Sequence, residues 1–138
     1  MIVRFGGRTF RRLTRAVAWF LVLAITVLSV SPPDYRPVTP APHDLEHFAI
    51  FLATGLAFGL GYQQGKLVQV LGLIVFSAGI ELIQLYIPGR HARLSDFVVN
   101  ATSVTLGCLA TLLLGRMARW WSDDSRTHSK PNFHQDRC

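Results

Sequence analysis

The chain has 138 residues, of which 50% are hydrophobic and only 16% charged, a balance that argues against a water-soluble domain of this size. The formal net charge of +6 would suit a nucleic-acid partner if the basic residues were spread over one folded surface. They lie outside the apolar segments instead, five before the first and five after the last, as cytoplasmic flanks of membrane proteins do. Composition therefore favours a membrane protein and argues against a nucleic-acid partner.

Four apolar segments are long enough to cross the hydrocarbon layer, since a helical span needs about 20 residues at about 1.5 Å each. Backbone polar groups inside that layer must be bonded within the segment, which favours helices. We predict spans at about 13–30, 45–62, 67–87 and 97–117. The predicted fold is an all-α integral membrane bundle of four transmembrane helices.

The first segment also resembles a signal peptide, because arginines precede its apolar stretch. No small-x-small cleavage site follows, and the run ends at Ser31-Pro32-Pro33. We therefore predict an uncleaved helix and, after it, a stiff connector whose five prolines cannot continue a helix. Short turns at 63–66 and from Pro88 join the remaining segments.

The distribution of lysine and arginine predicts the orientation of the bundle. With four spans, the N-terminus, the turn at 63–66 and the C-terminal tail share one side and hold eleven of the fourteen basic residues. The positive-inside tendency then places both termini in the cytoplasm of a multi-pass inner-membrane protein. The predicted parts are a basic cytoplasmic N-terminus (1–12), the transmembrane domain (13–119) and a polar, disordered cytoplasmic tail (120–138).

Polar residues of the second, third and fourth helices all fall at their extracytoplasmic ends. Asp44 and His47, and likewise Glu81 and Gln84, are three residues apart, so each pair shares a helix face. Asp96 and Asn100 are four apart, on a stripe that continues through small residues at 103 and 107. We predict that these faces form one polar site, which also includes Arg90 from the third connection.

Glu81 is the strongest indication of function, because an ionisable residue inside a transmembrane helix is costly and needs a partner. Near a helix C-terminus the dipole also disfavours its negative charge. Its expected partners are Arg90, Arg93, His47 and His43. A pairing of Glu81 with Arg90 that only holds the helices together is the structural alternative. Asp44 and Asp96 stand in first turns, where capping explains a carboxylate equally well.

The same end of the bundle also holds residues of the types that bind metals. His43 and His47 lie at i and i+4, and a carboxylate from Glu81 or Asp96 could complete a ligand set. The pattern lacks the glutamate of a His-Glu-x-x-His motif, and neither cysteine of the chain has ligand-like spacing. We therefore predict no metal and no other cofactor.

Together these residues resemble the VanZ-like family, small bacterial membrane proteins named for a component of a glycopeptide-resistance cluster associated with teicoplanin resistance. The resemblance covers about residues 44–107. It departs from the family pattern at Ser103, where members usually have glycine. Three blocks carry it: Asp44-Leu45-Glu46-His47-Phe48, Glu81-Leu82-Ile83-Gln84, and Pro88-Gly89-Arg90 leading into Ser95-Asp96-Phe97-Val98-Val99-Asn100. It implies a role at the cell envelope that affects glycopeptide susceptibility.

The leading hypothesis is a pocket for an anionic cell-envelope ligand, either lipid-linked or related to peptidoglycan. Arg90 would clamp the anionic group through its planar fork. His47, Glu81 and Asp96 are the candidate catalytic residues, the first two for proton transfer. The candidate ligand-binding residues are Asp44, Gln84, Arg90 and Asn100.

Two other hypotheses remain open from the sequence. The polar cluster could be structural, in a bundle whose role is partner binding or assembly. An ion or proton carrier would need polar residues continuing to the cytoplasmic side, where the sequence offers only scattered hydroxyls such as Thr54 and Ser77. Whether the protein is an enzyme, and its oligomeric state, are left open.

Overall fold

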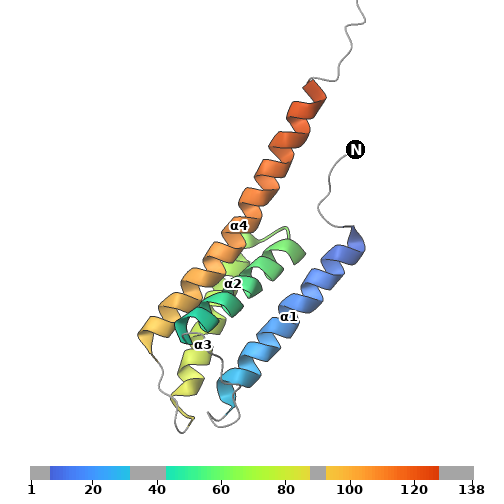
Figure 1. The fold of residues 1–138 in the computed structure, drawn as a ribbon. Coiled ribbons are helices and arrows are strands. Elements are labelled where there is room, and N and C mark those ends of the chain that lie inside the picture. The colour runs from blue at the N-terminus through green and yellow to red at the C-terminus, as the bar shows by residue number, and fades with distance from the viewer. Residues whose placement is uncertain (1–6, 32–42, 88–92, 128–138) are drawn as a thin grey trace, which may run out of the picture.

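The computed structural model describes residues 7–31, 43–87 and 93–127. Every regular element in these ranges is a helix, which confirms the all-α prediction (Figure 1). Three helices are long and apolar enough to cross a membrane: α1, α3 and the part of α4 from Leu94 to Met117. The apolar part of α2, Leu45–Gly61, is shorter. The helices are α1 (Arg8–Val30), α2 (His43–Gly61), α3 (Lys66–Gln84) and α4 (Leu94–Thr127).

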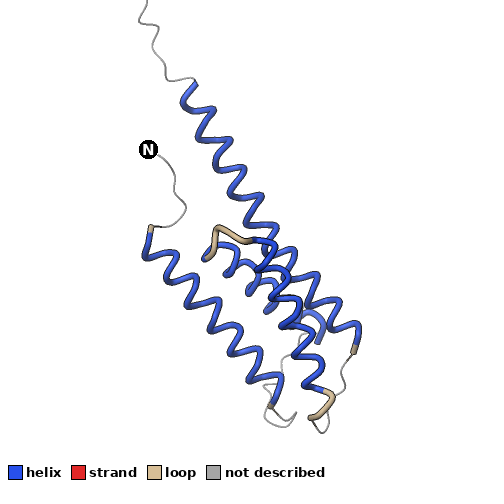
Figure 2. Tube along the Cα trace, turned by 180° about the vertical axis from the view of Figure 1, so that it is seen from behind, coloured by secondary structure: helices blue, strands red, loops and turns tan. Residues whose placement is uncertain are grey.

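Helix α2 lies at the centre of the bundle. Its most extensive contact is with α4, and α1 packs against its other side. Helix α3 packs mainly against α4 and touches α1 and α2 less. The start of α1 and the far end of α4 point to the same end of the molecule (Figures 1 and 2). We call this end the turn pole, because the turn between α2 and α3 also lies there, and the opposite end the polar-site pole.

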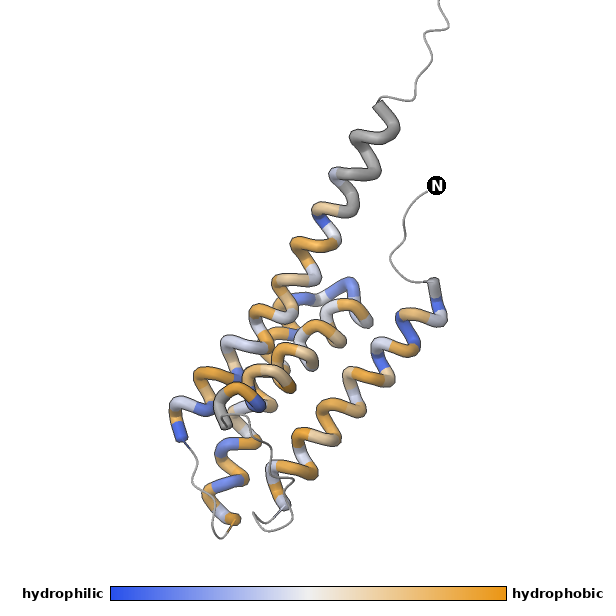
Figure 3. The backbone as a smooth tube through the Cα atoms, in the orientation of Figure 1, coloured by the Kyte–Doolittle hydropathy of each residue, from blue (hydrophilic) through white to orange (hydrophobic). Residues whose placement is uncertain are grey.

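The surface of the bundle has the opposite character from that of a soluble domain. Large apolar side chains such as Leu67, Val68 and Val75 are exposed, whereas Thr54, Ser77 and other polar side chains are buried. Figure 3 shows apolar residues along most of each helix and hydrophilic residues gathered toward the helix ends. An apolar exterior of this extent suits contact with lipid chains and would be a liability in water.

Helices α2 and α4 approach closely because glycines face each other across their interface. A Cβ atom added at Gly107 would lie 2.5 Å from the Leu52 carbonyl oxygen and 2.8 Å from the Leu56 nitrogen. A Cβ at Gly55 would collide with the Val104 carbonyl oxygen, and one at Gly59 with the Thr111 side chain. Small residues at such an interface are what allow two membrane helices to approach closely.

Two helix ends differ from the prediction. Helix α3 ends at Gln84 rather than Ile87, and Leu85 and Ile87 donate i→i−3 bonds to Leu82 and Gln84, at 3.2 and 3.3 Å. Pro88 disfavours helical backbone at the residue before it, which explains the early end.

Helix α4 continues to Thr127, although its apolar part ends at Met117 as predicted for the span. Residues 120–127, assigned above to a disordered tail, are helical. The apolar run stops at Met117, but no proline or glycine follows Gly115 before Thr127, so nothing in the backbone chemistry ends the helix there.

Candidate functional site

The centre of the candidate site is a chain of buried side chains from three helices. The Asn100 side-chain nitrogen on α4 donates to Oε1 of Glu81 on α3 at 3.2 Å. The Asn100 side-chain oxygen lies 3.1 Å from Nδ1 of His47 on α2. Asn100 is 0% exposed, His47 6% and Glu81 7%, so the three side chains meet inside the bundle. The predicted convergence of the three helix faces is thus present in the structure.

The hydrogen-bond pattern determines where the histidine proton lies. An amide oxygen can only accept, so Nδ1 of His47 must donate to Asn100. In the neutral ring, Nε2 is then the basic nitrogen. Phe51, one turn further along α2, stacks on the imidazole with ring centroids 6.2 Å apart and an angle of 16° between the planes. Tautomer and ring orientation are therefore both set by neighbours.

The Glu81 carboxylate is only partly satisfied. Its Oε1 atom accepts from Asn100, but Oε2 is buried with no hydrogen-bond partner among the described residues. Asp96 is close enough for its negative charge to repel that of Glu81. The backbone of Arg93, at the start of α4, also lies against the Glu81 carboxylate. Oε2 is thus a buried acceptor available to a water, a proton or a ligand.

Asp96 and Gln84 complete the described part of the site. Both side chains are buried, as their assignment to the site requires. Ser95 Oγ donates to Asp96 Oδ1 at 3.1 Å, and Asp96 stands in the first turn of α4, where the helix dipole favours its charge. Capping and site membership are therefore compatible roles for this residue.

Some predicted members fall outside what the structure describes. Arg90 lies in the undescribed segment 88–92, and the side chains of His43 and Asp44 are not described although their backbones belong to α2. Glu81 accepts a hydrogen bond from Asn100, which was not one of its four expected partners. Of those four, Arg93 lies against the carboxylate with its backbone, whereas Arg90 and the His43 side chain are outside the described residues.

The structure adds buried polar residues that the prediction left out of the site. Ser77 precedes Glu81 by one turn on α3, is fully buried, and its hydroxyl has no partner among the described residues. Thr54 and Ser103 are also fully buried, and their hydroxyls bond to carbonyls of their own helices at 2.7 and 2.6 Å. The i, i+4, i+7 spacing of Ser77, Glu81 and Gln84 would have revealed the first of these.

The arrangement can donate and accept hydrogen bonds and can move a proton. Glu81 Oε2 and His47 Nε2 are basic atoms on either side of a neutral amide. Within the described ranges, no three histidine, cysteine or acidic side chains are grouped as metal ligands. No family model, curated protein or solved structure matches the chain.

Proposed function

We propose that this protein is a VanZ-like, multi-pass protein of the bacterial inner membrane that binds an anionic cell-envelope ligand at the polar-site pole. The ligand class is lipid-linked or peptidoglycan-related, and the pole faces away from the cytoplasm. The observation that carries the proposal is the buried His47–Asn100–Glu81 network, in which one carboxylate oxygen has no hydrogen-bond partner among the described residues. A charge buried in a transmembrane bundle is costly to keep unless it serves the function of the protein.

In this proposal the basic residues bind the anionic group of the ligand, and Glu81 accepts a hydrogen bond from the ligand. Glu81 and Asp96 repel an anion, so the anionic group of the ligand is held by Arg90. Arg93, which is exposed directly before α4, is a second cation available to it. Glu81 Oε2 accepts a hydrogen bond from a hydroxyl or amide of the same ligand. Lipid-linked sugars and muropeptides carry both kinds of group.

A second candidate function is assembly, with a structural polar cluster. It is supported by the complete burial of Asn100, whose amide uses both its oxygen and its nitrogen to join three helices. A network that is satisfied in this way also specifies a single packing of the bundle. The two candidates differ in what a conservative change at Glu81 does.

The test is Glu81→Gln with Glu46→Gln as the matched control. The glutamine keeps an oxygen to accept from Asn100, so we expect the folded yield and thermal midpoint to stay near those of the wild type. Binding of a fluorescent polyprenyl phosphate in detergent should weaken by at least about tenfold, or ~1.4 kcal/mol. Glu46 is a half-buried carboxylate at the same pole that is not part of the His47–Asn100–Glu81 network. The Glu46→Gln variant should therefore bind the probe normally.

Teicoplanin susceptibility of cells expressing each variant supplies the physiological measurement. Arg90→Ala should also abolish any effect of the protein on susceptibility. Unchanged probe binding and unchanged susceptibility in both Glu81→Gln and Arg90→Ala would refute the ligand-binding proposal. Parallel losses of yield, thermal midpoint and binding in Glu81→Gln would favour the assembly role instead.

A further inference from the structure

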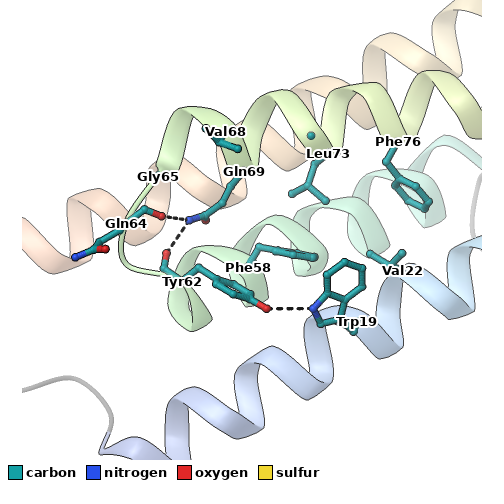
Figure 4. Close-up of a pocket in the computed structure, with 11 residues that line it drawn as sticks. Trp19, Val22, Phe58, Tyr62, Gln64, Gly65, Val68, Gln69, Leu73 and Phe76 are labelled. Carbon is teal, nitrogen blue, oxygen red and sulfur yellow. Dashed lines mark hydrogen bonds between the residues drawn. The ribbon is translucent and has the colours of Figure 1, made fainter.

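An apolar groove lies at the turn pole, at the other end of the helices from the polar site. It has a volume of about 620 Å³ and lies between α1, α2 and α3 (Figure 4). Its walls are almost entirely apolar, and its size falls within the range of about 300–1,000 Å³ that is usual for small-molecule sites. The residues that form the walls include Trp19, Val22, Phe58, Val68, Leu73 and Phe76.

The length of the groove is close to the thickness of the hydrocarbon part of one lipid leaflet. Along α3 it extends from Val68 to Phe76, which corresponds to about 12 Å at the rise of an α-helix. Half of the hydrocarbon layer of a bilayer is about 15 Å thick. It begins at the turn pole, where Gln64 and Gly65 of the turn line it, and continues toward the bundle centre. A single extended acyl chain from the leaflet on that side would fill it.

The end of the groove at the turn is lined by polar residues, and Lys66 lies next to them at the start of α3. We call this end the mouth of the groove. Gln69 donates to the carbonyls of Tyr62 and Gln64, while its side-chain oxygen is buried with no partner among the described residues. Lys66 directs its ammonium at the carbonyls of Gly59 and Tyr62, which uses two of its three donors.

The second cation is held beside the same mouth. Arg15 donates from Nε to the Gly61 carbonyl at 3.0 Å and lies 4.5 Å above the centre of the Tyr62 ring. Within the described structure, neither Arg15 nor Lys66 is paired with a carboxylate. Two positive charges therefore lie at the C-terminus of α2, next to the turn that lines one end of the groove.

The aromatic residues at the mouth also suit a membrane interface. Trp19 donates to the Tyr62 hydroxyl at 3.1 Å and packs edge-on against Phe58, with ring centroids 5.5 Å apart. Tryptophan and tyrosine with polar atoms satisfied in this way are typical of the headgroup level.

We propose that this groove binds one acyl chain of an anionic phospholipid, with the headgroup at Arg15 and Lys66. The chain gains packing rather than hydrophobic transfer, because lipid tails are as apolar as the groove. The groove is expected to prefer an anionic lipid over a zwitterionic one because of the positive charge at its mouth. One basic residue raises the affinity for the anionic lipid about fivefold. This inference is independent of the function proposed for the polar-site pole.

Quenching of Trp19 fluorescence tests the proposal. The protein has three tryptophans, so Trp120→Phe and Trp121→Phe leave Trp19 as the reporter. This variant is reconstituted in phosphatidylcholine vesicles containing increasing fractions of phosphatidylglycerol or phosphatidylcholine with brominated acyl chains. We expect brominated phosphatidylglycerol to quench at mole fractions about fivefold lower than brominated phosphatidylcholine, and Lys66→Gln to reduce this preference.

Two glycines of α3 provide a matched pair of variants. Gly72 lines the groove and Gly79 does not, yet an added Cβ meets nothing within 4 Å at either position. Gly72 and Gly79 are seven residues apart, so they lie on nearly the same face of the helix and are separated by two turns. Gly72→Phe should fill the groove and remove the preference for phosphatidylglycerol, whereas Gly79→Phe should keep it.

The outcomes are decisive even if a phenylalanine variant folds poorly. Equal quenching by the two brominated lipids in the otherwise unaltered protein would show only a general lipid shell around Trp19 and would overturn the proposal. An unchanged preference in Gly72→Phe, or its milder form Gly72→Leu, would overturn the assignment to this groove. Loss of the preference in Gly72→Phe but not in Gly79→Phe supports it.

Discussion

At the scale of single residues, the polar site depends on Asn100 because an amide is the side chain that can donate and accept at once. Glu81 needs a donor and the Nδ1–H of His47 needs an acceptor, and one asparagine supplies both at 3.2 and 3.1 Å. Aspartate would offer only acceptors, and leucine would leave both neighbours unpaired. The geometry therefore explains why this position carries asparagine.

Asn100→Ala should destabilise the bundle strongly. It leaves buried polar atoms of His47 and Glu81 without partners, which we expect to cost about 2–4 kcal/mol of unfolding free energy in total. Unfolding in mixed micelles, followed by circular dichroism, measures the loss. Ser103→Ala is the matched control on α4: its hydroxyl bonds only to its own helix, so the loss should stay below about 1 kcal/mol. Equal losses in the two variants would contradict the central role of Asn100.

How far the site could be predicted from sequence is also a matter of single residues. Spacing identified the helix faces of His47, Glu81, Gln84, Asp96 and Asn100, because helix periodicity is a local property. Which side chains bond to each other depends on the relative rotation and depth of three helices, and periodicity does not contain that information. The Asn100–Glu81 bond was missed for this reason.

At the scale of elements, the helix ends were predictable to within a few residues except at the end of α4, where the helix continues beyond its apolar part. Hydropathy reports where a helix leaves an apolar environment, and it located both ends of α2 closely. Hydropathy does not report where a helix ends in water, because that depends on capping residues and helix breakers. Pro88 is such a breaker after α3, whereas α4 has no proline or glycine between Gly115 and Thr127.

The short central helix is completed at its C-terminus by its neighbours. The apolar stretch Leu45–Gly61 spans about 26 Å, less than the hydrocarbon layer of about 30 Å. Its last carbonyls, which have no partners within the helix, accept from Arg15 of α1 and Lys66 of α3. Cations at a helix C-terminus also interact favourably with the helix dipole. The helix end is thus satisfied by side chains from both adjoining helices.

The glycine contact between α2 and α4 leads to a prediction at this scale. Gly107→Ala places a Cβ against backbone atoms of Leu52 and Leu56, which cannot move aside as a side chain could. We expect a loss of about 1–3 kcal/mol of unfolding free energy from forcing the helices apart. Gly115→Ala, where the added Cβ meets nothing within 4 Å, should be neutral or stabilising by up to about 1 kcal/mol. A stable Gly107→Ala protein would mean that the interface is looser than the structure shows.

At the scale of the whole molecule, the helices create two poles of different chemistry. The polar-site pole brings together buried carboxylates, an imidazole and amides, whereas the turn pole combines an apolar groove with cations bound to helix carbonyls. Of the nine basic residues in the described ranges, eight belong to the helix ends and the turn at the turn pole, and Arg93 lies at the polar-site pole. If the positive-inside tendency sets the topology, the turn pole faces the anionic cytoplasmic leaflet and the polar site faces outward.

Cysteine labelling of intact cells tests this orientation, on which both proposed sites depend for access to their ligands. Leu94 and Gln64 are exposed at opposite poles, and Cys108 is buried, so Cys138→Ser provides a suitable background for Leu94→Cys and Gln64→Cys. An impermeant maleimide should label Leu94→Cys in intact cells and Gln64→Cys only after permeabilisation, because the membrane shields the turn. The reverse pattern would place the Glu81 site in the cytoplasm, where extracytoplasmic glycopeptides could not reach it. The groove would then receive its lipid from the outer leaflet.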